Sequence, residues 1–335
     1  MTAMSKPRMS RAVFQERLPG YVVQAVLLAV VAWLVWRGIA NFQANARALH
    51  LSVGFDFLRT QAGFQIAQNL IAFTAASTYF DAVVVAALNT VLVIAMAGVF
   101  STLIGLIVAF GRLAPPGLVR SASSVYVEVF RNIPLLLQIL FWYFSAIALL
   151  PGLEDSIHIG PALLNNRGLF LPTLQIDPTF ALNRPQVDGF DVVGGVAILP
   201  ELMALTLGLS IYNGAFLAEI FRAGILSVPR GQIEAAATVG LSGTRGALLI
   251  VLPQALLVAL PAAGGQYQTL AKASSLAAAV GYPDIMQIVG GTVASQTSQA
   301  LEAMTLVVLL YAAINLAIAL IVNLANRRLL AHEGH

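Results

Sequence analysis

The sequence predicts an all-α integral membrane protein with about six transmembrane helices. Hydrophobic residues make up 59% of its 335 residues, whereas charged residues make up only 10%. Its longest apolar stretches reach about twenty residues, which matches a hydrocarbon core of roughly 30 Å at 1.5 Å rise per residue. A helix satisfies its own backbone hydrogen bonds in lipid, so we expect each stretch to be helical.

The apolar stretches divide the chain into spans and connecting segments. We expect spans at residues 21–40, 83–110, 125–150, 198–221, 246–263 and 301–324. Between and beside them lie an N-terminal segment (1–20), outer segments (41–82 and 151–197), a polar loop (222–245) and a tail (326–335). A signal peptide cleaved near Ala44-Asn45-Ala46 is the alternative for the first span. Its apolar run exceeds the usual 7–15 residues of such a peptide, so we expect a retained helix.

Basic residues predict the orientation of these spans. They gather in the N-terminal segment, in the loops near 111–123 and 222–245, and in the tail: Lys6, Arg8, Arg11, Arg17, Arg112, Arg120, Arg222, Arg230, Arg245, Arg327 and Arg328. The segment 151–197 is instead acidic. Because positively charged loops stay in the cytoplasm, we expect both termini and the 222–245 loop there.

Composition excludes several classes of function. The chain has no cysteine, and its four histidines lie in predicted loops or the tail without metal-ligand spacing, so we expect no metal site. Neither an HExxH nor a Gly-x-Ser-x-Gly motif is present, and we expect no catalytic residues. The net charge of +3 is small, and the basic residues flank the spans, so we do not expect nucleic-acid binding.

The segment 151–197 is too long for a simple turn and contains Pro, Asn, Asp and Gly at many positions. We expect an ordered but irregular cap there. We find no internal repeat, direct or inverted, which disfavours a secondary carrier, since many carriers consist of repeated halves.

A polar segment, Val228 to Pro253, interrupts two long hydrophobic stretches. Ser227 suits the N-cap and Pro229 the first turn of a short helix, and Gly240 suits its left-handed end. The alanines at 235–237 add little bulk, so another protein could approach the backbone closely. We expect a docking surface; an ordinary loop is the alternative.

Other polar and small residues lie within the predicted spans. Glu128 and Arg131 are spaced to pair on one helix face, and Pro134 predicts a kink. The stripe Ala97, Ser101 and Gly105 predicts close helix packing.

Ionisable or amide side chains in a span are candidates for a substrate pathway. We select Asn89, Gln138, Glu201, Lys272 and Ser274. For Asn89, bonding across helices is the alternative. For Glu201 the alternative is a solvated helix end, and for Lys272 it is a position facing the outer headgroups. The residues Pro261 and Gly264-Gly265 predict a broken helix after the fifth span, before Lys272.

Several motifs resemble those of one transporter family. The spacing Glu234-Ala235-Ala236, Gly240, Ile250, Leu252-Pro253 resembles the cytoplasmic loop of membrane subunits of ATP-binding cassette (ABC) importers. The stretches Tyr212–Ile225, Val228–Glu234, Glu128–Leu135 and Leu88-Asn89-Thr90 look like the polar amino-acid branch. Asn165–Gly168, Gly281–Asp284 and Phe55–Leu58 are similar to the general L-amino-acid permease subgroup. The resemblance covers about residues 50–325 and departs at Ala273, where the family usually has a polar residue.

The resemblance implies a type I importer permease core of five helices (83–325) plus one N-terminal helix, in a bacterial inner membrane. The implied partners are a second permease subunit, two ATPase subunits and a periplasmic amino-acid-binding protein. We expect the second permease to be a paralogue of this chain and not an identical copy. ATP and Mg²⁺ would be bound by the ATPase subunits, because this chain has no phosphate-binding loop and no cofactor is implied in it. The substrate would be a polar or general L-amino acid.

The resemblance also implies roles for particular residues. A coupling helix would include Arg230, Gly231, Glu234, Ala235, Ala236 and Gly240. A gate or subunit interface would include Glu128, Arg131, Pro134, Glu219 and Arg222. The alternative function is a secondary amino-acid carrier or channel that works without an ATPase.

Overall fold

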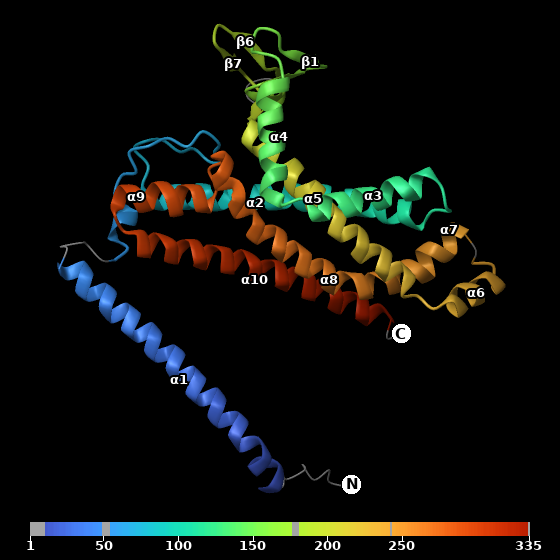
Figure 1. Ribbon diagram of the computed structural model, residues 1–335. Helices are drawn as coiled ribbons and strands as arrows, with labels where there is room; N and C mark the ends of the chain where they lie inside the picture. The colour runs from blue at the N-terminus through green and yellow to red at the C-terminus, as the bar shows by residue number, and fades with distance from the viewer. Residues whose placement is uncertain (1–10, 49–53, 176–180, 242, 334–335) are drawn as a thin grey trace. The chain divides into compact units, whose positions relative to one another are not determined.

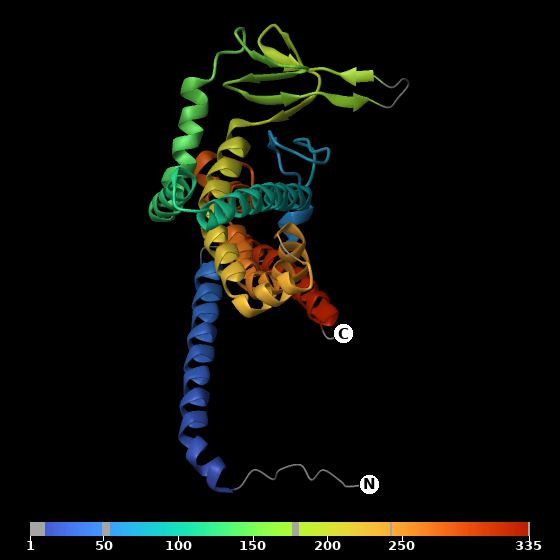
Figure 2. The same cartoon turned by 90° about the vertical axis from the view of Figure 1, so that its right-hand side faces the viewer.

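The computed structural model describes residues 11–48, 54–175, 181–241 and 243–333. Two compact units divide the chain after Gly54, and the described residues are mostly helical (Figures 1 and 2). Lys6 and Arg8, which contribute to the predicted orientation, lie outside the described residues.

The first unit contains one long helix, α1 (Arg11–Ala48). Its stretch Gly20–Asn41 is long and apolar enough to cross a membrane, which confirms a helix at the predicted span 21–40. Apolar side chains such as Leu28 (69% exposed) and Trp36 (63%) are not covered within this unit.

Long helices in the second unit contain four further predicted spans. They are α2 (Tyr79–Leu113), α5 (Pro200–Leu226), α8 (Leu252–Ala273) and α10 (Ala300–Glu333). The predicted spans 83–110, 198–221 and 301–324 fall within α2, α5 and α10 apart from the first two residues of 198–221. The span 246–263 falls in the membrane-compatible stretch Ala247–Val280 apart from its first residue. These predictions are confirmed.

The third predicted span, 125–150, is wrong as a single helix. Two helices occupy it, α3 (Leu118–Asn132) and α4 (Leu135–Leu149), and they are bent by 103°. Ile133 precedes Pro134 and is extended, with φ −83° and ψ 127°, because a residue before proline is disfavoured in the α region. The kink predicted at Pro134 is therefore a full break.

The expected irregular cap at 151–197 is also wrong, because the segment forms short antiparallel strands. β1 (Ile157–Ile159), β2 (Ala162–Asn165), β3 (Gly168–Leu171) and β8 (Val196–Ile198) form one sheet in that order. Two hairpins are inserted before β8: β4 (Thr173–Gln175) with β5 (Ala181–Asn183), and β6 (Gln186–Asp188) with β7 (Asp191–Val193). Strands of three or four residues are too short to show a clear alternation of apolar and polar residues.

Short helical elements connect the spans. They are η1 (Asp56–Arg59), α6 (Arg230–Thr238), α7 (Gly243–Gly246), η2 (Ala247–Val251), η3 (Ser274–Val280), η4 (Met286–Val293) and α9 (Ala294–Thr297). The break predicted after Pro261 and Gly264-Gly265 is wrong, since α8 continues to Ala273. Gly264 instead allows α8 and α10 to approach: a Cβ there would lie 2.6 Å from a methyl carbon of Val322.

Helix α5 packs against α2, α3, α4 and α8. Its glycines lie at close contacts with different neighbours: a Cβ on Gly208 would lie 2.8 Å from Ile139 of α4, and one on Gly224 would lie 2.7 Å from the Ala255 carbonyl oxygen of α8. The stripe predicted on α2 is confirmed, because Ala97 and Ser101 are fully buried and a Cβ on Gly105 would lie 2.8 Å from that of Leu217. Small residues thus position α5 within the second unit.

The segment 55–78 folds onto the helices that follow it. Phe57, Ile66 and Phe73 are buried in a core that also contains Val85 of α2 and Ile285, which precedes η4. Thr78 caps α2 through a reciprocal pair of bonds with Asp81, an arrangement that satisfies backbone N–H groups at a helix start.

We predict that Gly224→Ala lowers the stability of the folded protein by about 1–3 kcal/mol, because the new methyl group would meet a backbone oxygen that cannot rotate away. The thermal unfolding midpoint of the purified protein in detergent measures this. Gly265→Ala on α8 is the control, since a Cβ there has no neighbour within 4 Å. Equal midpoints for the two variants would contradict the predicted close contact.

Candidate functional site

The short helix α6 presents an exposed surface. Arg230, Gly231, Glu234 and Ala235 are exposed, and Ala236 is buried beneath them. Two apolar side chains are also exposed, Ile233 at 45% and Val239 at 73%. An apolar patch rimmed by polar groups can mark a surface that another protein covers, so α6 is a candidate docking surface.

The end of α6 has a defined turn. Gly240 has φ +82°, its N–H donates to the Ala237 carbonyl at 3.1 Å, and the Leu241 N–H donates to the Ala236 carbonyl at 2.9 Å. This pair of bonds is the Schellman motif, which favours glycine at the left-handed position. The prediction for Gly240 is confirmed.

The predicted start of α6 is only partly confirmed. Pro229 is the residue immediately before the helix, whereas Ser227 ends α5, where its hydroxyl donates to the Gly224 carbonyl at 2.7 Å. Ser227 is therefore not the N-cap of α6. The preceding helix continues farther than its hydrophobic pattern indicates, so the hydroxyl bonds backwards along the chain.

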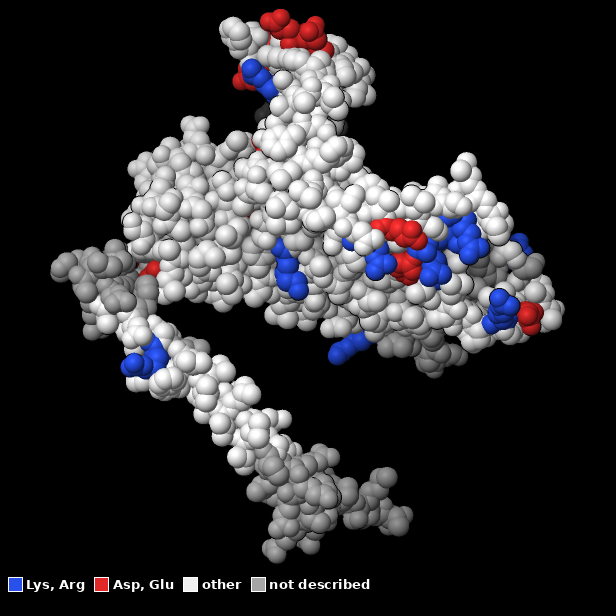
Figure 3. Space-filling view, viewed as in Figure 1, with Lys and Arg blue, Asp and Glu red and all other residues white. Residues whose placement is uncertain are grey.

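Charged side chains from three helices form a second candidate site. On the face shown in Figure 3, acidic and basic groups gather over α3 and α5, and most of the surrounding surface is uncharged. Glu219 of α5 forms ion pairs with Arg112 of α2 and, at 3.0 Å, with Arg222 of α5. These three side chains are only 20–30% exposed. The pair with Arg112 joins the ends of α2 and α5, whereas the pair with Arg222 lies within α5.

A cavity of about 480 Å³ lies beside these ion pairs, and we name it the charged cavity. It is lined by Arg112, Val127, Glu128, Arg131, Asn132, Phe216 and Glu219. The guanidinium carbon of Arg131 lies 4.7 Å from the centre of the Phe216 ring, a distance at which a cation and an aromatic face attract. The cavity therefore brings together three of the five residues predicted for a gate.

The pairing of Glu128 with Arg131 that their spacing permits does not occur. Among the described residues, neither side chain forms an ion pair, since the pairs at this place all use Glu219. Arg131 is drawn to Phe216 instead. Of the other two predicted gate residues, Pro134 lies at the bend and Arg222 is paired with Glu219 without lining the cavity.

The five predicted pathway residues lie apart from the charged cavity. Gln138 is buried and its amide donates to the Phe130 and Ile133 carbonyls, both at 3.0 Å. It thus bonds to carbonyl groups at the broken end of α3. The Ser274 hydroxyl donates to the Ala271 carbonyl at 2.8 Å.

The remaining pathway residues have different surroundings. Lys272 is exposed in the last turn of α8. Glu201, at the start of α5, accepts a long hydrogen bond of 3.4 Å from the Tyr143 hydroxyl. Neither side chain lines the charged cavity.

Asn89 belongs to a buried hydrogen-bond network that joins distant parts of the chain. Its amide donates to the Gln68 carbonyl at 2.7 Å and to the Pro283 carbonyl at 2.9 Å. Close by in sequence, Asp284 accepts from the Tyr311 hydroxyl at 2.9 Å and from the Gln287 N–H at 2.7 Å. Burial raises the pKa of the Asp284 carboxyl to about 6, and these two bonds oppose the rise. Asn89 thus forms hydrogen bonds between separate segments of the chain, which agrees with the structural alternative to a pathway role.

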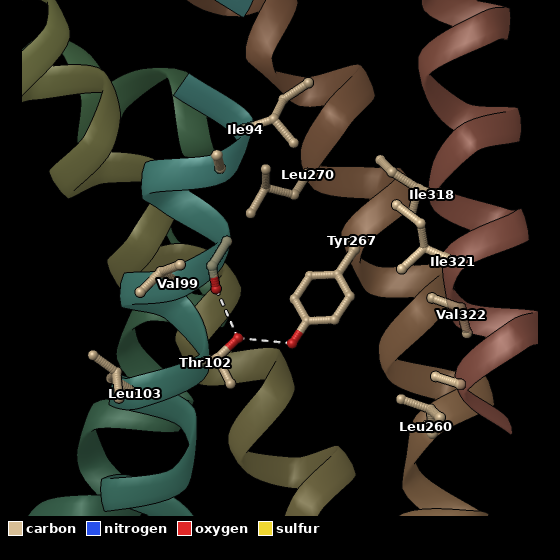
Figure 4. A pocket seen from close by; sticks show the side chains of 13 residues that line it. Ile94, Val99, Thr102, Leu103, Leu260, Tyr267, Leu270, Ile318, Ile321 and Val322 are labelled. Carbon is tan, nitrogen blue, oxygen red and sulfur yellow. Dashed lines mark hydrogen bonds between the residues drawn. The ribbon is translucent and has the colours of Figure 1, made fainter. Parts of the chain in front are cut away.

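A second cavity, of about 510 Å³, lies among α2, α8 and α10 and is apolar (Figure 4). Thr102 and Tyr267 supply the polar side-chain groups of its lining. Their hydroxyls lie 2.7 Å apart, and Thr102 donates to the Gly98 carbonyl. Because these groups already bond to each other and to the backbone, the cavity offers little to a charged ligand.

Comparison with known proteins identifies the family. A family model described as binding-protein-dependent transport system inner membrane component matches residues 101–331, more than half of the chain. The chain belongs to this family. As an inner membrane component of such a transport system, it is a multi-span permease subunit.

Individual relatives of this permease subunit cover nearly its whole length. The permease protein YhdX of Escherichia coli (strain K12) is 37% identical, with 90% of this chain and 91% of YhdX aligned. The general L-amino acid transport system permease protein AapQ of Rhizobium johnstonii is 33% identical, over 95% of this chain and 94% of AapQ.

Solved structures share the fold. A chain in the crystal structure of an amino acid ABC transporter with histidines superposes with a TM-score of 0.55 at 23% identity, over 75% of this permease and 95% of that chain. The fold is thus that of type I ABC importer permeases, as the sequence predicts.

Four of the seven residues that line the permease's charged cavity were not among the predicted gate residues: Arg112, Val127, Asn132 and Phe216. Arg112 was interpreted only as a determinant of orientation, although its place in the last turn of α2 was a signal that it could meet another helix end. Phe216 lies one turn before Glu219 and gave no signal of its own.

We predict that Glu219→Gln lowers stability by about 1–2 kcal/mol, because Arg112 and Arg222 would lose their shared ion-pair partner while still lying close together. The thermal unfolding midpoint of the purified permease measures this. Glu128→Gln is the control and should have a smaller effect, since Glu128 is exposed and has no ion-pair partner among the described residues. A larger loss for Glu128→Gln would contradict the assignment.

We predict that Asp284 makes the permease less stable as pH rises from about 4 to about 6. Its pKa is raised from 3.8 to about 6 in the folded protein, so the folded state binds more protons than the unfolded state in this window. Over that range the unfolding midpoint of the wild type should fall relative to that of Asp284→Asn. Parallel curves for the two proteins would refute the prediction.

Proposed function

We propose that this chain is a membrane-spanning permease subunit of an ATP-driven importer for polar or general L-amino acids. Substrate would arrive from a periplasmic binding protein and pass through the membrane by alternating access. Family membership supports the class of transporter, and the name of the relative AapQ, a general L-amino acid permease protein, supports the class of substrate. The observation that carries the coupling role is the exposed helix α6 with its left-handed end at Gly240.

The proposed complex contains two permease subunits, of which the second is a paralogue, and two ATPase subunits that bind ATP and Mg²⁺. Helix α6 would lie in a groove of one ATPase subunit, so that closure of the ATPase pair moves α6 and opens the pathway to the outside. Ile233 and Val239 would then be covered, which accounts for two apolar side chains exposed on a short polar helix. Both termini would lie in the cytoplasm, as the basic loops indicate.

Reconstitution tests this proposal against a carrier or channel that works alone. Substrate-loaded binding protein should stimulate ATP hydrolysis by the complex in proteoliposomes, and uptake should require ATP. Uptake that is driven by an ion gradient without the ATPase subunits would refute the proposal.

We predict that Gly240→Val uncouples transport. Valine at φ +82° costs more than the about 1–2 kcal/mol of an ordinary L residue in the left-handed region, so the turn that positions α6 should change. Binding-protein-stimulated ATP hydrolysis and uptake should both fall several-fold while the subunits still purify together.

Gly240→Asn is the matched control, because asparagine tolerates the left-handed conformation better than other non-glycine residues. It should retain most of the uptake. Full uptake by Gly240→Val at normal levels of the complex would contradict a coupling role for this turn.

A further inference from the structure

The charged cavity contains one carboxylate and one guanidinium that no ion pair neutralises. Glu219 forms ion pairs with both Arg112 and Arg222. Glu128 and Arg131, in contrast, form no ion pair among the described residues. Phe216 holds the Arg131 guanidinium through its ring face. A stacked guanidinium keeps its N–H groups in the plane free to donate, so the cavity has an unused donor set and an unused acceptor set.

These two groups lie near the break between α3 and α4. Both lie in the last two turns of a helix of 15 residues, which is about 22 Å long. Together with α4 this helix is long and apolar enough to form a broken membrane span. Ionised groups in a membrane span face the interior of the assembly or a water-filled pathway, because exposure to hydrocarbon is costly.

The two groups match the backbone of a free amino acid. A guanidinium binds a carboxylate through two parallel N–H···O bonds, and a carboxylate accepts from an ammonium group. A volume of about 480 Å³ is also within the range of small-molecule sites, roughly 300–1,000 Å³.

We propose that the charged cavity is an amino-acid subsite at the inner end of the pathway. Arg131 binds the carboxylate, Glu128 binds the ammonium group, and Phe216 orients Arg131. The ligand is recognised by its zwitterionic backbone and not by its side chain, which suits an importer of several amino acids. This inference rests on the proposed function, because it assumes that amino acids reach this end of the permease.

Equilibrium binding of radiolabelled L-glutamine tests the subsite. The complete nucleotide-free complex is held in nanodiscs without the binding protein, and glutamine is chosen because its side chain is uncharged. Arg131→Gln and Glu128→Gln should each weaken the binding of glutamine about tenfold or more. Arg120→Gln is the matched control, because Arg120 lies on the same helix and does not line the cavity.

Two analogues assign the contacts. Glutamine methyl ester lacks the carboxylate, so its weak binding should be unaffected by Arg131→Gln and lowered further by Glu128→Gln. N-acetylglutamine lacks the ammonium group and should show the opposite pattern. Arg131→Lys keeps the charge and should retain part of the affinity, which separates loss of the ligand contact from loss of the fold.

Three outcomes would overturn the subsite. The first is that the wild-type complex binds no L-glutamine in the millimolar range. The second is that Arg131→Gln and Glu128→Gln both bind L-glutamine as tightly as the wild type. The third is loss of the second permease subunit from either variant on purification, which would make the pair a subunit contact. ATP hydrolysis stimulated by the binding protein, measured on the wild-type complex, tests the proposed function independently.

Discussion

The second unit depends on how closely helix α5 approaches its neighbours. In lipid, apolar side chains gain little from leaving their surroundings, so helices associate through close packing. Gly208 and Gly224 bring α5 against α4 and α8, and Gly105 of α2 receives Leu217. The same helix carries Phe216 and Glu219 into the charged cavity and ends just before α6. The packing of α5 therefore positions two residues of the charged cavity and the point from which α6, the proposed coupling surface, begins.

The break at Ile133-Pro134 has a second structural effect. It leaves carbonyl groups at the end of α3 without partners in their own helix, and the buried amide of Gln138 bonds to two carbonyls there. A polar residue in a span is a functional candidate when only the sequence is known. Once the break is seen, Gln138 has a structural reason to be present.

Features encoded in a few adjacent residues were predictable from the sequence. Gly240 ends α6 as expected, because the left-handed turn is a local property of the chain. The proline rule located the break in the third span, although not its size. Features that need a partner far away in sequence were not predictable: the ion pair of Arg112 with Glu219 joins two helices, and Asn89 bonds to carbonyls of Gln68 and Pro283. The attraction of Arg131 to Phe216 likewise displaced the local pair with Glu128.

The network around Asn89 bears on where the folded permease begins. Gln68 supplies a carbonyl to Asn89, and Phe57 and Phe73 cover the same core as Ile285. The family match, by contrast, starts only at residue 101. A shortened chain that keeps the matched region alone would lose the first part of α2 and the segment packed on it, and would expose Ile285 and neighbouring core residues. The smallest piece that retains this core starts near Phe55, well before α2, the first helix that the family match reaches.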